Sequence, residues 1–274
     1  MEWLDKFWHR TLGMPFKLSY REYGGRGKVV VLLHGIASDN TFWTPLVQRL
    51  ERTTDYRIIV PDLLGHGESP TPSYIDYSVD DQVKALRRLL LAVGTPQVVM
   101  VGHSMGCLVA SRFASQNPTL TSQLLLYEPP LFTTVPGFET RNRRQEFYRR
   151  LYEQIAANPT GKLTMARMLA RISKNWKRYL ETDQTWLPIQ KSLRNTIMQQ
   201  KSYEELKDTT IRTDIVHGRL DVIIPSHNLR RRLANNANIT FYKTTDRHRL
   251  SAVSVRTLAD IIASSARLPD NRKA

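Results

Sequence analysis

The sequence predicts an α/β protein with a mostly parallel, doubly wound sheet, helices on both of its faces and an inserted segment of helices. Two observations support this prediction. Short apolar runs alternate with helical patterns along most of the 274 residues, and strands that alternate with helices of this length form parallel sheets. The alternation stops after residue 130 and resumes near residue 208, with no convincing strand between them.

Seven runs rich in β-branched residues are expected to be strands, and five helical patterns lie between and after them. The strands are expected at residues 17–23, 29–33, 57–60, 98–101, 123–127, 211–216 and 239–243. The helices are expected at residues 42–50, 79–93, 105–115, 227–237 and 254–266. Because ligands of such sheets bind at the carboxyl ends of the strands, residues just after each run are the candidates for chemistry.

Residues 131–207 are expected to form a helical insertion, with helices at 139–157, 163–173 and 184–200. Pro129, Pro130 and Pro136 stiffen its entry, because proline fixes φ and removes a backbone donor. We therefore divide the chain into an N-terminal helix at 1–15, a core domain at 16–130 and 208–274, and the insertion at 131–207. The insertion is rich in Arg and Lys, which fits either an ordinary solvated basic surface or a preference for an acidic acyl substrate or an acidic carrier protein.

The first twelve residues predict an amphipathic helix, because large apolar side chains recur there at helical spacing. These side chains are Trp3, Leu4, Phe7, Trp8 and Leu12. The helix is expected to dock on its own domain; the alternative is a peripheral anchor that lies in a membrane interface.

The bulk composition excludes several classes of protein. The net charge is +15 and the pI is about 10.1, but no nucleic-acid recognition motif accompanies this charge, so no nucleic-acid partner is expected. No stretch is long and apolar enough to span a membrane, and the N-terminus lacks the pattern of a secretion signal. Cys107, the single cysteine, permits no internal disulfide. A cytoplasmic location is therefore expected.

The segment Gly102-His103-Ser104-Met105-Gly106 follows a β-branched run and precedes a helical pattern. A serine hydroxyl becomes a nucleophile only when a base can remove its proton. A sharp strand-to-helix turn projects the hydroxyl out of the sheet, and glycines on both sides leave room for that turn. Ser104 is therefore the candidate nucleophile.

With these features the chain resembles the α/β-hydrolase family, and in particular its serine hydrolases with a helical cap, which are carboxylesterase-like. The resemblance covers nearly the whole chain, from about Lys17 to about Arg267. Its landmarks appear in the order that the family uses: Val29–Gly35, Pro61–Ser69, the serine turn, His217–Asp221 and Asp246–His248.

The resemblance implies a catalytic triad of Ser104, Asp221 and His248. Of the seven histidines, only His248 follows both the serine and the acid and lies after the last strand, which matches the family order. Glu128 is the rival acid, since some members of the family carry the acid at the end of that earlier strand. The family usually has a glycine before the histidine, where this chain has Arg247.

The resemblance also assigns the oxyanion hole to the backbone N–H groups of Ile36 and Met105. Trp43 is expected either to pack in the core or to form a wall of the pocket. Trp176 and Trp186 of the insertion are candidates for substrate contacts or for the core of the cap. There is no phosphate-binding glycine loop and no zinc motif in the sequence, so neither a cofactor nor a metal is expected.

These features predict a cofactor-independent serine hydrolase that cleaves carboxylic esters or related acyl compounds through an acyl-enzyme. The alternative is hydrolysis of a carbon–carbon bond in a vinylogous diketone of the meta-cleavage-product type. Relatives with that activity often have asparagine where this chain has His103. Cofactor-free perhydrolysis and a non-catalytic ligand receptor are more distant alternatives, because fold alone does not decide function.

Overall fold

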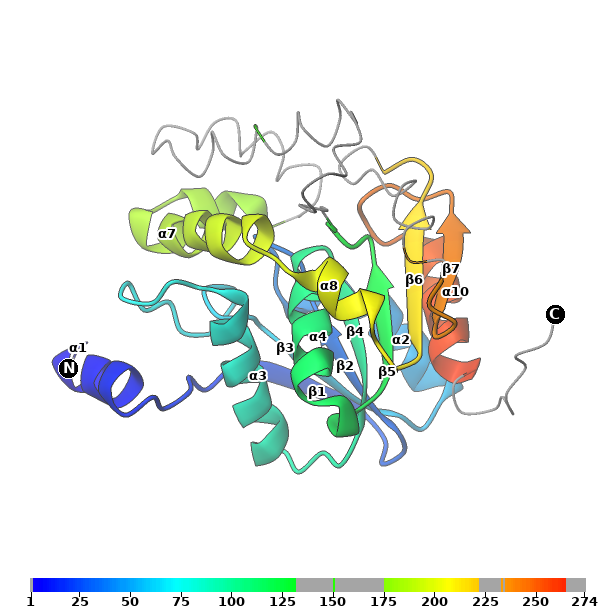
Figure 1. Ribbon diagram of the computed structural model, residues 1–274, viewed down its shortest axis with the longest axis horizontal. Coiled ribbons are helices and arrows are strands. Elements are labelled where there is room, and N and C mark those ends of the chain that lie inside the picture. Colours follow the sequence, from blue (N-terminus) through cyan, green and yellow to red (C-terminus); the bar gives the residue numbers. More distant parts are fainter. Residues whose placement is uncertain (1, 132–149, 151–174, 222–232, 234, 265–274) are drawn as a thin grey trace.

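A computed structural model describes residues 2–131, 150, 175–221, 233 and 235–264, and these residues contain a seven-stranded sheet (Figure 1). Its strands are β1 (Tyr20–Gly24), β2 (Val29–Leu33), β3 (Arg57–Pro61), β4 (Val98–His103), β5 (Thr121–Tyr127), β6 (Thr213–Gly218) and β7 (Ile239–Thr244). They lie in the order β1-β3-β2-β4-β5-β6-β7. Only β1 is antiparallel to its neighbour, so the predicted mostly parallel sheet is confirmed.

The strand order reverses at β2, which lies between β3 and β4. The chain leaves β2 toward one edge of the sheet and leaves β4 toward the other. Crevices that bind ligands form at such reversal points, at the carboxyl ends of the strands. The predicted oxyanion loop follows β2 and the serine turn follows β4, so both lie at the carboxyl ends of strands beside this reversal point.

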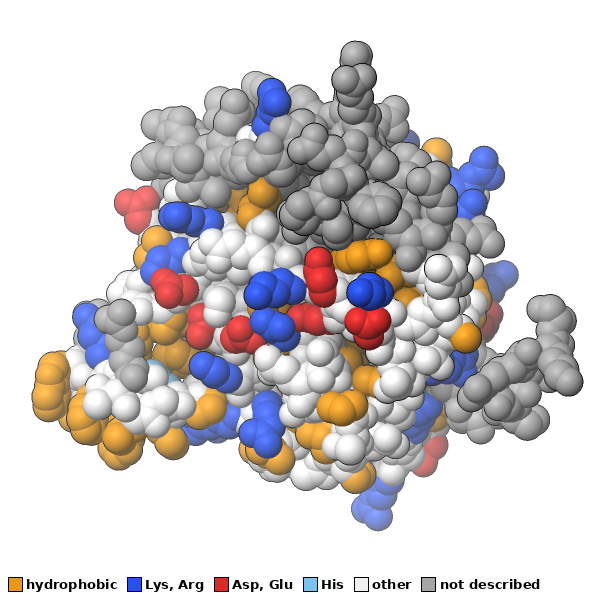
Figure 2. Space-filling model, viewed as in Figure 1, with side chains coloured by type: hydrophobic (Ala, Val, Ile, Leu, Met, Phe, Trp, Pro, Cys, Tyr) orange, Lys and Arg blue, Asp and Glu red, His pale blue; other side chains and the backbone are white. Residues whose placement is uncertain are grey.

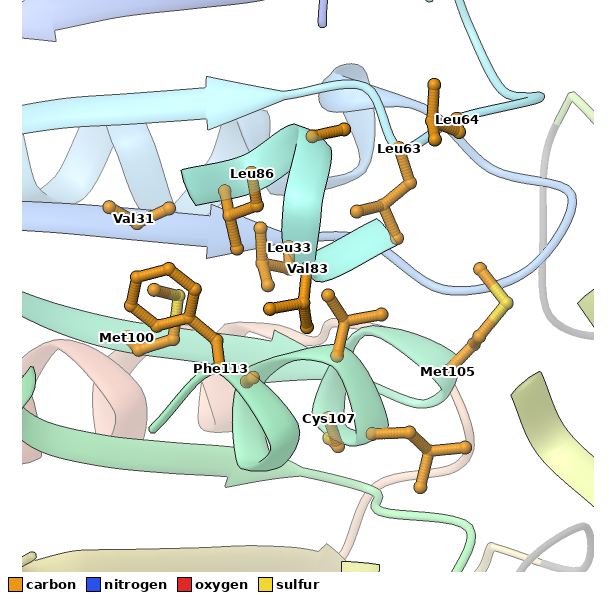
Figure 3. Packing of buried hydrophobic residues seen from close by; sticks show 14 of the residues in the cluster. Val31, Leu33, Leu63, Leu64, Val83, Leu86, Met100, Met105, Cys107 and Phe113 are labelled. Atoms are coloured by element: carbon orange, nitrogen blue, oxygen red, sulfur yellow. The ribbon is translucent and has the colours of Figure 1, made fainter. Parts of the chain in front are cut away.

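Helices cover both faces of the sheet, as predicted (Figure 1). The helices α3 (Val79–Ala92) and α4 (Met105–Gln116) pack on one face, while α2 (Thr44–Thr53) and α10 (Ala252–Ser264) pack against each other on the opposite face. Figure 3 shows part of the first cluster, where Val83, Phe113 and Leu33 lie close together. Because both faces are covered, β2 is buried at all five positions, which explains its uninterrupted apolar sequence.

Each predicted strand is present, with shifted ends. The first begins at Tyr20 rather than at residue 17, because the backbone N–H of Ser19 donates to the Ser69 hydroxyl instead of to β3. The sixth begins at Thr213 rather than at residue 211. Short 3-10 helices, η2 (Asn40–Trp43) and η3 (Pro118–Leu120), precede α2 and β5.

Part of the insertion is described. It contains η5 (Trp176–Leu180), α7 (Asp183–Ser192), the π-helical η6 (Leu193–Met198) and α8 (Ser202–Lys207). The helix predicted at 184–200 corresponds to α7 and η6. The helices predicted at 139–157 and 163–173 lie outside the described residues, apart from residue 150, as does most of the one predicted at 227–237. The division into three domains stays a prediction.

The predicted N-terminal helix is present as α1 (Glu2–Lys6) and the π-helical η1 (Phe7–Thr11). The helix contacts the domain, as expected, but its apolar side chains do not make that contact. Trp3, Leu4, Phe7, Trp8 and Leu12 are between 40% and 74% exposed. The helix touches the domain through its other face, where Lys6 lies over the ring of Tyr74 and His9 stacks on Phe16. No helix in the described ranges is both long and apolar enough to cross a bilayer.

Candidate active site

Ser104 lies between the end of β4 and the start of α4, with φ +50° and ψ −120°. This backbone conformation is strained for any residue except glycine. It is the strained strand-to-helix turn that a Gly-x-Ser-x-Gly sequence predicts. The serine is 6% exposed, so it is almost completely buried.

The two glycines of the turn have separate steric roles. A Cβ on Gly106 would lie 2.4 Å from the carbonyl oxygen of Leu33, so any side chain there would push α4 away from β2. A Cβ on Gly102 would lie 2.6 Å from the backbone nitrogen of Cys107. The sequence pattern therefore reflects close contact of backbone with backbone on both sides of Ser104.

The loop after β2 comes close to the serine. A Cβ on Gly35 would lie 3.1 Å from the Cβ of Ser104. His34 holds this loop, because its Nδ1–H donates to the Gly35 carbonyl at 2.8 Å and its Nε2 accepts from the Leu63 N–H at 3.0 Å. Burial lowers the pKa of His34, which keeps the ring neutral and able to make both bonds. Ile36 follows directly, and Met105 begins α4, where the helix leaves its N–H unused.

Asp62 braces the loop from the other side. Its fully buried carboxylate accepts hydrogen bonds from the backbone N–H groups of Asn40 at 2.6 Å and Glu68 at 2.9 Å. Gly65 and Gly67 have φ values of +80° and +54°, which glycine alone adopts readily. The turn from Pro61 to Ser69 is thus structural, in agreement with its sequence.

The turns after β6 and β7 bring the predicted acid and base together. The Nδ1–H of His248 donates to Oδ2 of Asp221 at 2.7 Å, and both side chains are almost completely buried. Backbone bonds join the two turns, from Arg219 N–H to the Thr244 carbonyl and from Leu220 N–H to the Asp246 carbonyl. An aspartate in this position holds the tautomer in which the Nε2 of the imidazole is free to act as a base.

The Nε2 of His248 is buried and makes no hydrogen bond with any residue that the structure describes. The structure therefore joins Asp221 and His248 directly, but it shows no hydrogen bond from His248 to Ser104. The base lies beside the serine turn all the same, since the ring of His103 is 4.9 Å from the ring of His248.

Glu128, the rival acid, lies behind Asp221 instead of contacting the histidine. Its Oε1 accepts from the Gly218 N–H at 2.7 Å, and the residue is fully buried. Burial, the charge of Asp221 and a hydrogen bond to Asp221 raise the pKa of Glu128 to about 11. Glu128 is therefore neutral, and its protonated carboxyl group lies beside the carboxylate of Asp221.

Oxygen and nitrogen atoms of Glu128, Asp221 and His248 lie within 4.8 Å of one another, a spacing that a metal ion could span. Two of these groups are not available as metal ligands. The Nδ1 of His248 is bonded to Asp221, and Glu128 is protonated. The cluster is suited to proton transfer.

Sequence reasoning missed the aromatic residues that hold the base. His103 stacks on Phe42 with ring centroids 4.2 Å apart, and the Tyr127 ring lies 5.4 Å away. Burial, followed by the positive charges that His248 and His34 would carry, lowers the pKa of His103 far below its usual range. His103 is therefore a neutral packing residue. Its position inside the Gly-x-Ser-x-Gly sequence was the only signal available.

The three tryptophans proposed for the pocket differ in their surroundings. Trp43 is fully buried in the cluster between the sheet and α2, which agrees with a packing role. Trp186 is 4% exposed and Trp176 is half-buried, and both pack against the larger cluster. The insertion touches the site through Tyr179, whose hydroxyl donates to the Ser38 carbonyl at 2.6 Å and accepts from the Gly67 N–H at 3.1 Å.

Comparison with known proteins agrees with this architecture. The family model described as the alpha/beta hydrolase fold matches residues 28–232, and the chain therefore belongs to the alpha/beta hydrolase family. It is 37% identical over 117 residues to Lipase LipV of Mycobacterium tuberculosis. It is 33% identical over 115 residues to the probable lysophospholipase BODYGUARD 4 of Arabidopsis thaliana.

Each of these two alignments covers 42% of this chain, and they cover 43% of LipV and 28% of BODYGUARD 4. The matched part thus spans less than half of either relative. Among solved structures, an esterase, EaEST from Exiguobacterium antarcticum, superimposes with a TM-score of 0.74 at 20% identity, covering 92% of this chain and 96% of the esterase. At this identity the likeness shows the fold alone.

Proposed function

We propose that this protein is a serine hydrolase that cleaves carboxylic esters or related acyl compounds through an acyl-enzyme. The observation that carries the proposal is the 2.7 Å hydrogen bond from His248 to Asp221, made next to a strained turn that holds Ser104. The names of two relatives, a lipase and a probable lysophospholipase, support the same chemistry.

In the proposed mechanism, Asp221 fixes the tautomer of His248 and stabilises the imidazolium that forms. The Nε2 of His248 takes the proton of Ser104 as the serine oxygen attacks the carbonyl carbon. The N–H groups of Ile36 and Met105 stabilise the negative oxygen of the tetrahedral intermediate. The intermediate expels the alcohol, which receives the proton from His248.

The second half of the reaction repeats these steps with water. His248 takes a proton from a water molecule, and the resulting hydroxide attacks the acyl-serine. The carboxylic acid then leaves and Ser104 recovers its proton. These proposed reaction steps require no cofactor. The basic charge of the insertion favours acidic acyl groups or an acidic carrier protein as substrates. An increase in salt concentration would weaken this preference.

A fluorophosphonate probe together with a series of activated esters tests the proposal. The wild-type protein should be labelled and should hydrolyse at least one ester, while Ser104→Ala should lose labelling and about 10⁴-fold or more in activity. Ser111→Ala is the matched control, because Ser111 lies two turns further along α4 and its buried hydroxyl has no hydrogen-bond partner among the described residues.

Equal labelling of Ser104→Ala and the wild type would overturn the assignment of the nucleophile. A dienone substrate, run beside the esters, separates ester hydrolysis from cleavage of a carbon–carbon bond. If the wild-type protein turned over neither substrate and reacted with no probe, a ligand receptor built on the same fold would replace the proposed enzyme.

A further inference from the structure

The N-terminal helix exposes an unusual amount of apolar surface. Six large apolar side chains between residues 3 and 14 are 40–74% exposed: Trp3, Leu4, Phe7, Trp8, Leu12 and Met14. They form an apolar face that Figure 2 shows as a cluster at one corner of the molecule. Only three other large apolar residues in the described part of the chain are comparably exposed, and they lie apart from one another in the sequence.

The apolar face is continuous. The rings of Trp3 and Phe7 stack with centroids 6.3 Å apart, and those of Phe7 and Trp8 meet edge to face at 6.2 Å. Leu4 lies one turn before Trp8 along the helix, and Leu12 lies one turn after it. Contiguous apolar patches of this kind mark interaction sites on soluble proteins.

The opposite side of the helix is the side that touches the domain. Lys6 lies 5.7 Å from the centre of the Tyr74 ring, and the ring of His9 stacks on Phe16 at 3.7 Å. Arg88 of α3 donates to the carbonyl of Pro15 and holds the end of the segment. An amphipathic helix on a globular domain ordinarily buries its apolar face. Here the polar face is turned inward and the apolar face outward.

We propose that this apolar face docks into the interfacial region of an anionic bilayer. Tryptophan prefers the level of the lipid headgroups, and two of the six side chains are tryptophan. The charge is complementary, because the whole chain carries +15 and an anionic membrane attracts basic proteins. The first 21 residues contain four Lys or Arg against two Asp or Glu. A helix that lies flat with aromatic residues on one side is typical of interfacial binding.

A second copy of the chain is the competing occupant of this face. Two copies would bring like charges of +15 together, which disfavours their association. The anionic headgroups of a bilayer surface would instead attract this positive charge. The proposal does not depend on the proposed hydrolase activity.

Sedimentation of the full chain with vesicles tests the proposal. Vesicles of phosphatidylcholine with about 30% phosphatidylglycerol should bind the protein far better than pure phosphatidylcholine, and binding should weaken between about 0.1 M and about 0.5 M salt. The double variant Trp3→Ala/Trp8→Ala should lower the partition coefficient by about tenfold or more. Val253→Ala is the control, since Val253 on α10 is 50% exposed and Trp8 is 51% exposed.

The altered side chains are on the surface, so thermal unfolding should be the same for the double variant, the control and the wild type. Equal binding of the double variant and the wild type to anionic vesicles would overturn the proposal. Failure of the wild-type protein to bind the anionic vesicles would also overturn the proposal. A dimer that the double variant dissociates, in a protein that does not bind vesicles, would assign the face to a second copy instead.

Discussion

A carboxyl oxygen of Glu128 lies within 4.8 Å of a carboxyl oxygen of Asp221, and the same Asp221 accepts the Nδ1–H of His248 at 2.7 Å. Two acidic side chains therefore meet at the positions where members of this family carry either one or the other. They avoid repulsion because burial, with the charge of Asp221, keeps Glu128 protonated. Glu128 thus supports the acid of the proposed triad as a hydrogen-bond donor.

Replacement of Glu128 by glutamine should preserve this arrangement. The amide N–H₂ can donate to Asp221 and the amide oxygen can accept from the Gly218 N–H, as Glu128 does now at 2.7 Å. We expect Glu128→Gln to keep kcat within about threefold of the wild type and Glu128→Ala to lower it by about tenfold or more, since alanine leaves the Gly218 amide without its acceptor. Steady-state kinetics on an activated ester measures both variants.

The same substitution should change how stability depends on pH. The folded protein holds the pKa of Glu128 at about 11, whereas in an unfolded chain it is near 4.5. Above pH 4.5 the unfolded chain loses this proton and the folded one keeps it, so the free energy of unfolding falls as pH rises toward 11. Glu128→Gln removes that loss. Its melting temperature should exceed that of the wild type by several degrees at about pH 8, and the gap should close below about pH 4.5.

If the melting temperatures of Glu128→Gln and the wild type stayed parallel across this pH range, Glu128 would not be neutral in the folded protein. The variant Asp208→Asn serves as the control, because the Asp208 side chain is 77% exposed and removal of its charge should leave the pH profile nearly unchanged.

Asp221 is expected to be essential for the reactivity of the serine. Asp221→Asn removes the acceptor that fixes the tautomer of His248, and a loss of about 10⁴-fold in kcat is typical of such a change. The rate of fluorophosphonate labelling should fall in parallel. The matched control is again Asp208→Asn, which should be labelled at the wild-type rate. Unchanged labelling of Asp221→Asn would show that Glu128 supplies the acid.

His34 should matter for turnover although it lies outside the proposed triad. His34→Ala removes the bonds that tie the Gly35 carbonyl and the Leu63 N–H together, so the loop that carries the Ile36 amide loses its brace. Loss of one oxyanion donor costs about 10²–10³ in kcat. We expect a fall in kcat of about 10–100-fold with a smaller change in KM. A fall confined to KM would place the effect in substrate binding.

Gly106 should tolerate no side chain. A Cβ would lie 2.4 Å from the Leu33 carbonyl oxygen, so Gly106→Ala should destabilise the fold by about 3 kcal/mol or more. Gly94→Ala provides the comparison, because Gly94 has φ +65° but open space around its Cα. The cost there should be only about 1–2 kcal/mol, from backbone strain alone. Denaturant unfolding of both variants would measure the difference, and equal costs would contradict the steric explanation.

The sequence by itself determined the strands, the helices of both faces and the order of the chemical groups. Apolar periodicity and glycine spacing are local properties, so β2 and the turn around Ser104 could be located without a structure. Only the tertiary structure decided which of Glu128 and Asp221 contacts His248. Glu128 and Asp221 each follow a strand of the same sheet. Their distances from the imidazole depend on how the turns after β5, β6 and β7 meet.

The N-terminal helix shows the same division between what the sequence determines and what the tertiary structure decides. Its amphipathic pattern predicts a helix with an apolar side, but a periodicity contains no information about which side faces the domain. The side that faces the domain is set by contacts between residues apart in the sequence, such as Lys6 with Tyr74 and His9 with Phe16. It also depends on the binding partner available to the exposed side. Local patterns specify elements, whereas the pairing of surfaces is a property of the folded chain.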